Sequence, residues 1–161
     1  MVPSVSYGMA TVVKNIPITA GEEVIVIGEQ YPSNYYSWKS KVESSGGSIE
    51  VIHAPKDNRE RSTVWNRKIL ESITIKTKVV AIANVHWTDG TWFDLETISN
   101  RAKECNALLV IDGSQSIGAL PFDIQKIKPD AVFTVGYKWL LGPFALGLGY
   151  LGDFFDNGTP L

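Results

Sequence analysis

The chain has 161 residues, of which 44% are hydrophobic and 20% charged, and its formal net charge is -2 at pH 7. These proportions are typical of a globular domain with one hydrophobic core, and they exclude disordered and collagen-like chains. Because there is no basic excess, we expect no binding to nucleic acid or to an anionic membrane surface. No apolar run approaches the roughly 18 residues of a membrane span, and the first residues lack a signal-peptide pattern.

Cysteine and histidine are scarce. The lone Cys105 cannot form an intramolecular disulfide, and we expect it to be structural. With only His53 and His86, the chain lacks the clustered ligands of a zinc site, so no metal is expected. A reducing, cytoplasmic setting suits this composition.

Short apolar, β-branched runs alternate with amphipathic stretches along the chain. Ser4 and Ser6 are candidate caps of the first helix, Asp94 caps a later one, and the polar stretch 56–61 is expected to be a loop. Continuous apolar strands separated by helices predict a single α/β domain of three layers, with a mainly parallel sheet covered by helices on both faces. In chain order, the patterns predict helix 7–15, strand 23–27, helix 34–45, strand 49–54, helix 62–73, strand 79–85, helix 94–105 and strands 107–111, 131–135 and 146–151.

In such sheets, ligands bind beyond the carboxyl ends of the strands. The segments that follow the predicted strands are 28–34, 86–90, 112–118 and 136–143, and they hold an acid, an amide, a lysine and several aromatic residues. We therefore expect the functional side chains to gather at this edge of the sheet.

Lys138 and Asp112 are the two most informative of these residues. Alone, a lysine beside apolar residues is more often a surface residue whose long stem reaches water, and Asp112-Gly113 is ordinary turn chemistry. Together, a lysine and an acid after neighbouring strands are the parts that hold pyridoxal phosphate, the lysine as a Schiff base and the acid on the ring nitrogen.

Residues 110–151 contain D-G-x-Q-x-x-G, then P-x-D, then G-Y-K-W-L-x-G-P, in that order. This stretch resembles the core of the class V aminotransferase family of fold type I pyridoxal-phosphate enzymes, which includes cysteine desulfurases and kynureninases. The upstream segments VPSVSYG, EQYPSN and HWTDG are similar too, so the resemblance covers essentially the whole chain. It implies the large domain of that fold, with the N-terminal arm and the C-terminal small domain expected to be absent.

The resemblance also implies roles for individual residues. Lys138 would hold the cofactor as an internal aldimine and move the substrate α-proton as acid and base. Asp112 would keep the ring nitrogen protonated, Gln115 would hydrogen-bond the phenolic oxygen, and Tyr137 resembles a phosphate ligand.

Further residues follow from the upstream segments. Val5 and Ser6, at the start of the first helix, resemble the phosphate cradle of the family. Tyr31 is similar to the aromatic residue that stacks on the ring in kynureninases, and Asn34 is nearby. His86, expected to be catalytic, and Trp87 lie in the loop that faces the cofactor ring and substrate.

Structural alternatives stay open for two of these residues: His86 as a hydrogen-bonded loop histidine, and Tyr31 packed against the neighbouring cluster of Tyr35, Tyr36 and Trp38.

The functional prediction is a transaminase or lyase that depends on pyridoxal phosphate and acts on an amino acid as part of a homodimer. The alternative is a truncated, non-catalytic fragment of this fold, because no arginine matches the one that grips the substrate carboxylate in the family. A serine hydrolase is disfavoured, because its catalytic histidine would have to follow the serine segment 114–118, and both histidines of the chain come before it. A dinucleotide-binding domain is disfavoured because the glycine motif G-x-G-x-x-G does not follow the first strand.

Overall fold

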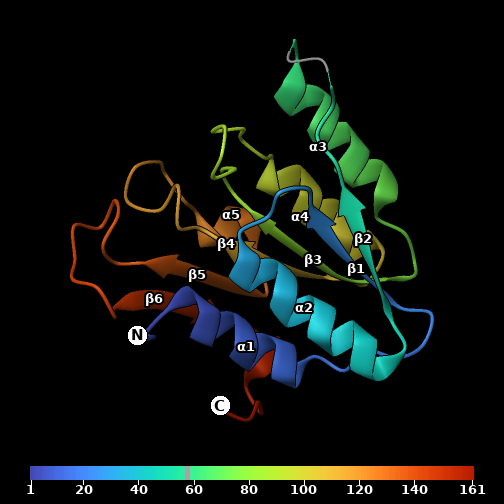
Figure 1. Ribbon diagram of the computed structural model, residues 1–161, viewed down its shortest axis with the longest axis horizontal. Helices are drawn as coiled ribbons and strands as arrows, with labels where there is room; N and C mark the ends of the chain where they lie inside the picture. The colour runs from blue at the N-terminus through green and yellow to red at the C-terminus, as the bar shows by residue number, and fades with distance from the viewer. Residues whose placement is uncertain (57–58) are drawn as a thin grey trace.

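The computed structural model describes residues 1–56 and 59–161, so the centre of the loop expected at 56–61 lies outside the described residues. The strands of the described part form one six-stranded sheet in the order β2-β1-β3-β4-β5-β6 (Figure 1). All neighbours pair parallel except β5 and β6, which pair antiparallel. The bounds are β1 (Glu23–Ile27), β2 (Ser48–Ile52), β3 (Thr77–Ala83), β4 (Leu108–Asp112), β5 (Ala131–Val135) and β6 (Gly147–Leu151).

Helices cover both faces of the sheet. On one face lie α1 (Val5–Asn15) and α2 (Pro32–Ser45); on the other lie α3 (Arg61–Ser72), α4 (Leu95–Glu104) and the short α5 (Ile124–Ile127). None of the helices in the described ranges is long and apolar enough to cross a membrane.

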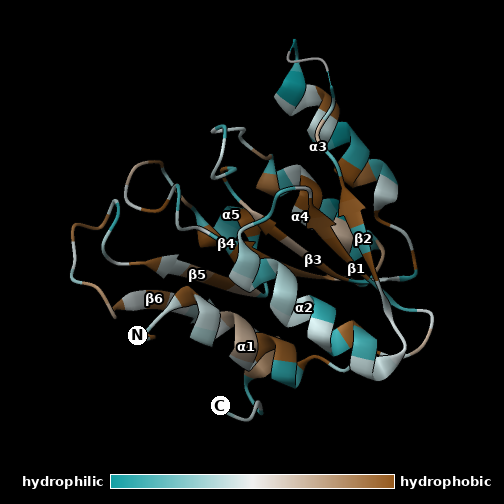
Figure 2. Cartoon of the chain, in the orientation of Figure 1, coloured by the Kyte–Doolittle hydropathy of each residue, from teal (hydrophilic) through white to brown (hydrophobic). Residues whose placement is uncertain are grey.

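The strands β1 to β5 contribute to two hydrophobic cores, one on each face of the sheet. In β1, Ile25 and Ile27 pack towards α3 and α4, whereas Val24 and Val26 pack towards α1 and α2. Because successive side chains point to opposite faces, a strand that is covered on both sides must be apolar throughout. The strongly hydrophobic strands between the two helical layers in Figure 2 show this arrangement, which confirms the three-layer α/β prediction.

The predicted element ends are correct to within a few residues. Helix α1 begins earlier than expected because Ser4 is its N-cap, and the Ser4 hydroxyl accepts a hydrogen bond of 3.1 Å from the Tyr7 amide. Ser6, also expected as a cap, lies inside this helix. Asp94 caps α4 as predicted and accepts from the Thr97 amide at 3.1 Å. The sequence patterns missed α5 and the 3-10 helix Asp153–Phe155, which are too short to show a helical period.

Close packing on Phe133 places α1 against the sheet. A Cβ atom at Gly8 of α1 would lie 2.3 Å from Phe133 Cδ1, and one at Gly149 of β6 would lie 2.7 Å from Phe133 Cε1. Val2 also pairs with Gly147 through backbone hydrogen bonds of 3.0 and 2.7 Å. These contacts hold the N-terminus of α1 beside the carboxyl end of β5.

Replacing Gly8 by Ala is expected to destabilise the protein by about 1–3 kcal/mol, because the added methyl group overlaps the Phe133 ring. Urea unfolding followed by far-UV circular dichroism measures the change. Because Phe133→Leu opens space at the same point, the double variant should lose less stability than the sum of the two single variants. Strictly additive losses would contradict this packing.

Candidate functional site

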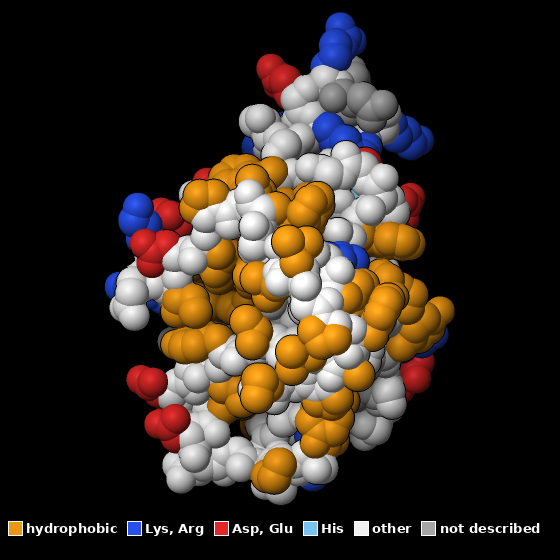
Figure 3. All heavy atoms as spheres, turned by 90° about the vertical axis from the view of Figure 1, so that its left-hand side faces the viewer, with side chains coloured by type: hydrophobic (Ala, Val, Ile, Leu, Met, Phe, Trp, Pro, Cys, Tyr) orange, Lys and Arg blue, Asp and Glu red, His pale blue; other side chains and the backbone are white. Residues whose placement is uncertain are grey.

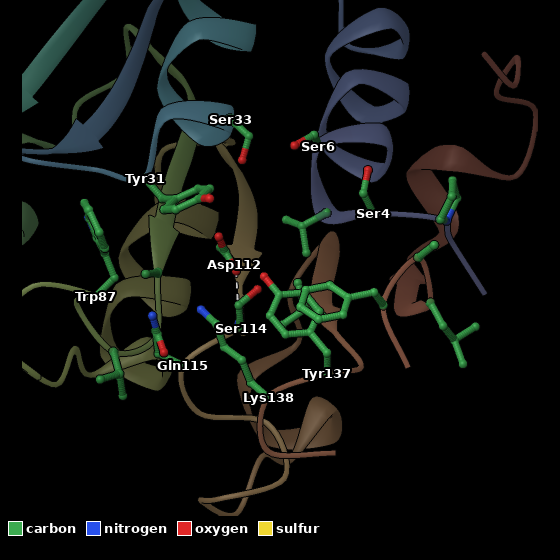
Figure 4. A pocket seen from close by; sticks show the side chains of 18 of the residues that line it. Ser4, Ser6, Tyr31, Ser33, Trp87, Asp112, Ser114, Gln115, Tyr137 and Lys138 are labelled. Carbon is green, nitrogen blue, oxygen red and sulfur yellow. Dashed lines mark hydrogen bonds between the residues drawn. The ribbon is translucent and has the colours of Figure 1, made fainter. Parts of the chain in front are cut away.

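A pocket of about 230 Å³ opens at the carboxyl edge of the sheet. Its walls come from the turns after β1, β3, β4 and β5, the first residues of α1 and α2, and the loop that leads into β6. Figure 4 shows side chains from these segments pointing into one central space. Most of the predicted site residues line it, namely Val5, Ser6, Tyr31, Trp87, Asp112, Gln115, Tyr137 and Lys138.

Asp112 is the last residue of β4 and is buried at the floor of the pocket. Its Oδ1 accepts a hydrogen bond of 2.9 Å from the Ser114 amide. Burial is the largest influence and raises the pKa of the Asp112 carboxyl, while hydrogen bonds from Ser114 and the nearby charge of Lys138 act in the opposite direction. A buried carboxyl of this kind favours a cationic N–H group as its partner in the pocket.

The turn after β4 supplies two more polar side chains. Gly113 donates to the Phe133 carbonyl at 2.8 Å, and the Ser116 amide donates back to the Gly113 carbonyl at 3.0 Å, so the turn is tightly folded. This conformation directs Ser114 and Gln115 into the pocket. Ser114 was not predicted as a site residue, although its place two residues after Asp112 in a tight turn is a usable signal.

Lys138 lies in the loop between β5 and β6. Gly136 binds the Leu146 carbonyl at 2.8 Å, and Gly142 binds the Gly136 carbonyl at 2.8 Å, so the loop folds back on itself. The Lys138 side chain extends towards Asp112, Ser114 and Gln115 (Figure 4). The loop geometry therefore brings the only lysine in the pocket lining of the described residues next to the buried acid.

Two aromatic pairs flank the pocket. Tyr137 stacks on Phe144, with ring centroids 4.3 Å apart and an angle of 23° between the planes. Tyr31 meets Trp87 edge to face at 5.4 Å. Tyr31 thus lines the pocket instead of packing under its neighbouring aromatic cluster.

Hydroxyl groups gather at the N-terminus of α1. Ser4 and Ser6 line the pocket beside the free N–H groups of the first helical turn, an arrangement that suits an anion. Ser33, in the first turn of α2, also lines it, and its buried Oγ has no hydrogen-bond partner among the described residues. Sequence reasoning missed Ser4 and Ser33 as site residues because nothing in the sequence shows that α1 and α2 lie side by side.

Two predicted residues do not line the pocket. The structure corrects the expectation that His86 faces the cofactor: its ring is only 1% exposed and lies in contact with Trp65 and Phe93. The open alternative of a hydrogen-bonded loop histidine describes its position. Asn34 is buried in α2, where its Oδ1 accepts from Trp38 Nε1 at 3.3 Å.

The remaining lining fits pyridoxal phosphate. It offers an amine, a buried carboxyl for a protonated ring nitrogen, an amide, aromatic faces and a helix N-terminus with hydroxyl groups for a dianion. Among the residues that the structure describes, no group of three or more histidine, cysteine or acidic side chains is placed to hold a metal ion.

Comparison with known proteins gives a consistent result. The chain is 26% identical over 141 residues to a probable cysteine desulfurase of Pyrococcus abyssi, a match that covers 87% of this chain and 34% of the relative. The chain therefore spans about a third of the length of the curated relatives it matches.

Solved structures share the fold. A cysteine desulfurase of Escherichia coli superposes with a TM-score of 0.87 at 19% identity, over 99% of this chain and 40% of that one. A mutant form of C-DES with glycine covalently linked to its pyridoxal-phosphate cofactor superposes with a TM-score of 0.82 at 18% identity, over 98% and 41% of the two chains.

A family model gives the most direct assignment. Residues 4–155 match the model for class-V aminotransferases, and this range includes every residue that lines the pocket except Pro3. The chain belongs to the aminotransferase class-V family.

Proposed function

We propose that this chain is the cofactor-binding core of a transaminase or lyase that depends on pyridoxal phosphate and acts on an amino acid. The observation that carries the proposal is the meeting in one pocket of Lys138, from the loop after β5, with Asp112 and Gln115, from the end of β4 and the turn that follows it. Membership of a family whose structures include a pyridoxal-phosphate complex supports it. Because the chain spans about a third of the length of its relatives, we also propose, and do not infer from them directly, the activity of the whole protein.

When bound, pyridoxal phosphate supplies an electron sink for charge that develops at the substrate α-carbon. Asp112 would hold a proton on the ring nitrogen, because its buried carboxylate would be stabilised by that N–H group. Lys138 Nζ would hold the cofactor covalently and would move the substrate α-proton. Gln115 would orient the ring by a hydrogen bond to its phenolic oxygen.

The other lining residues bind and orient. The first turn of α1, with Val5 and Ser6, would bind the phosphate through its N–H groups, and Tyr137 would add a hydroxyl group. Tyr31, with Trp87 at its edge, would cover the ring and exclude water.

The relatives named above include cysteine desulfurases, and a desulfurase needs a reactive thiol near the substrate. Cys105 is buried, with its Sγ 3.8 Å from the Ile73 carbonyl oxygen, and does not line the pocket. This chain therefore contributes no thiol to such a step.

We also propose that the protein forms a homodimer in the cytoplasm. Figure 3 shows hydrophobic side chains gathered on the face formed in part by the loop between β5 and β6. Large exposed apolar areas are typical of surfaces that bind another protein. The exposed large hydrophobic residues from this loop and β6 are Tyr137, Trp139, Leu140, Leu141, Phe144, Leu148 and Leu151.

Borohydride reduction of the protein with pyridoxal phosphate is expected to leave a covalent label on Lys138, because its amine faces the pocket. Peptide mass spectrometry locates the label. Lys138→Ala should lose it entirely, whereas Lys39→Ala, at an exposed site on α2, should keep it. Absence of label in the wild-type protein would favour the alternative, a non-catalytic fragment.

Asp112→Asn is expected to make the unliganded protein more stable at neutral pH than the wild type. Burial raises the pKa of Asp112 above its ordinary value of 3.8, so wild-type stability falls as pH rises from that value through the folded pKa. Asparagine does not ionise, and its advantage should therefore grow with pH over the same interval.

Urea unfolding of both proteins from pH 4 to pH 8 measures this advantage. Asp123→Asn, at the exposed N-cap of α5, makes the same side-chain change away from the pocket and is the control. A constant difference between Asp112→Asn and wild type at all pH values would contradict the assigned burial effect.

A further inference from the structure

His86 binds the turn that carries Tyr31. Its Nε2 lies 3.1 Å from the Gly28 carbonyl oxygen, in the turn between β1 and α2, although the two residues are far apart in sequence. A carbonyl oxygen only accepts hydrogen bonds, so Nε2 is the protonated nitrogen and donates. The ring is fully enclosed and contacts Trp65 and Phe93 edge to face, which holds it in this orientation.

The next two residues of the turn, Glu29 and Gln30, also form hydrogen bonds with β3 or with the loop that follows it. Trp87 Nε1 donates to the Glu29 carbonyl at 2.7 Å, and Gln30 Nε2 donates to the Ala81 carbonyl of β3 at 2.9 Å. Three successive residues of the turn are thus tied to β3 or to the loop that follows it. Glu29 has a φ of 54°, a left-handed conformation that a non-glycine residue keeps only when its surroundings impose it.

The other side of the His86 ring faces a charged anchor. Nδ1 accepts a hydrogen bond of 3.0 Å from the Thr88 hydroxyl, and Asp89 Oδ1 lies 3.2 Å from the same nitrogen. Asp89 Oδ2 forms an ion pair of 2.7 Å with Arg61 at the start of α3. Burial acts to raise the pKa of Asp89, but hydrogen bonds from Thr91 and Arg61 prevail and lower it to about 2, so the carboxylate is ionised at neutral pH.

The two aromatic residues at the pocket depend on these backbone bonds for their position. Tyr31 and Trp87 are each 47% exposed, so burial alone does not hold their rings. Tyr31 immediately follows the bound turn, and Trp87 immediately follows His86. A change in the His86 contact therefore moves both partners of the edge-to-face pair.

We propose that His86, held by Thr88 beside the ion pair of Asp89 and Arg61, is a positioning residue that fixes the turn 28–30 and thereby sets Tyr31 and Trp87 at the pocket. The value of this arrangement for cofactor binding rests on the proposed function. The positioning itself is a property of the unliganded chain and is tested without any cofactor.

Hydrogen exchange of the unliganded protein is the first test. His86→Ala removes the donor to Gly28, and we expect the amides of residues 28–31, 33 and 34 to exchange about three- to tenfold faster, the effect of losing one hydrogen bond. His86→Gln keeps an N–H group that reaches the Gly28 carbonyl and should restore most of the protection. Ile98→Val, in the same hydrophobic core but distant from the turn, controls for loss of stability alone.

Asp89→Asn is a second variant, placed in a partly exposed loop, that decides the matter if His86→Ala does not fold. It weakens the anchor without emptying the core, so the same amides should exchange faster by a smaller factor while β4 and β5 keep their protection. Uniform acceleration over all strands, or unchanged exchange at 28–34 in both variants, would overturn the proposal.

The circular dichroism of bound pyridoxal phosphate in its visible band is the second readout, because it reports how the ring sits in its asymmetric site. We expect His86→Ala to weaken this signal, and His86→Gln to recover it, at equal amounts of cofactor on Lys138. An unchanged signal in His86→Ala would refute the link to the pocket. A wild-type protein that binds no cofactor would refute the proposed function instead, while the exchange result would still judge the positioning.

Discussion

Parallel pairing of the strands is the constraint on which the pocket depends. Because β1, β3, β4 and β5 run in the same direction, their carboxyl ends and the turns that follow them meet at one edge of the sheet. Asp112 ends β4 and pairs with Ala83 of β3 and Phe133 of β5, so it lies in the middle of that edge. The antiparallel β6 starts at the same edge, which forces the chain between β5 and β6 to double back and carry Lys138 towards Asp112.

Helix α1 completes the pocket through packing and not through the sheet itself. Phe133 lies between two glycines, Gly8 of α1 and Gly149 of β6, and any larger residue at either position would push these elements apart. The close approach directs the capped N-terminus of α1 at the space above Asp112 and Lys138. A positive helix end and a buried acid thus line the same pocket, a combination that suits a ligand with a phosphate group and a basic ring nitrogen.

The loop between β3 and α4 illustrates the limit of prediction from sequence. Its position after a strand correctly placed it at the functional edge, and Trp87 does line the pocket. The neighbouring His86 points the opposite way, into the core beside Trp65, where it holds the turn of Tyr31. Adjacent residues of an irregular loop have no fixed angular relation, so their identity alone did not reveal which one faces the ligand. Asn34 was misplaced for a related reason, since its face of α2 is buried by packing.

By itself, the amino-acid sequence determined the α/β class, the order of the main elements and the candidate pair Lys138 and Asp112, because apolar periodicity and residue type are local properties of the chain. Only the tertiary structure decided which side chains share the pocket, that Ser33 and Ser114 join them, and that His86 does not. Those outcomes depend on contacts between residues far apart in sequence, such as His86 with Gly28 and Gly8 with Phe133, and these form only when the layers pack together.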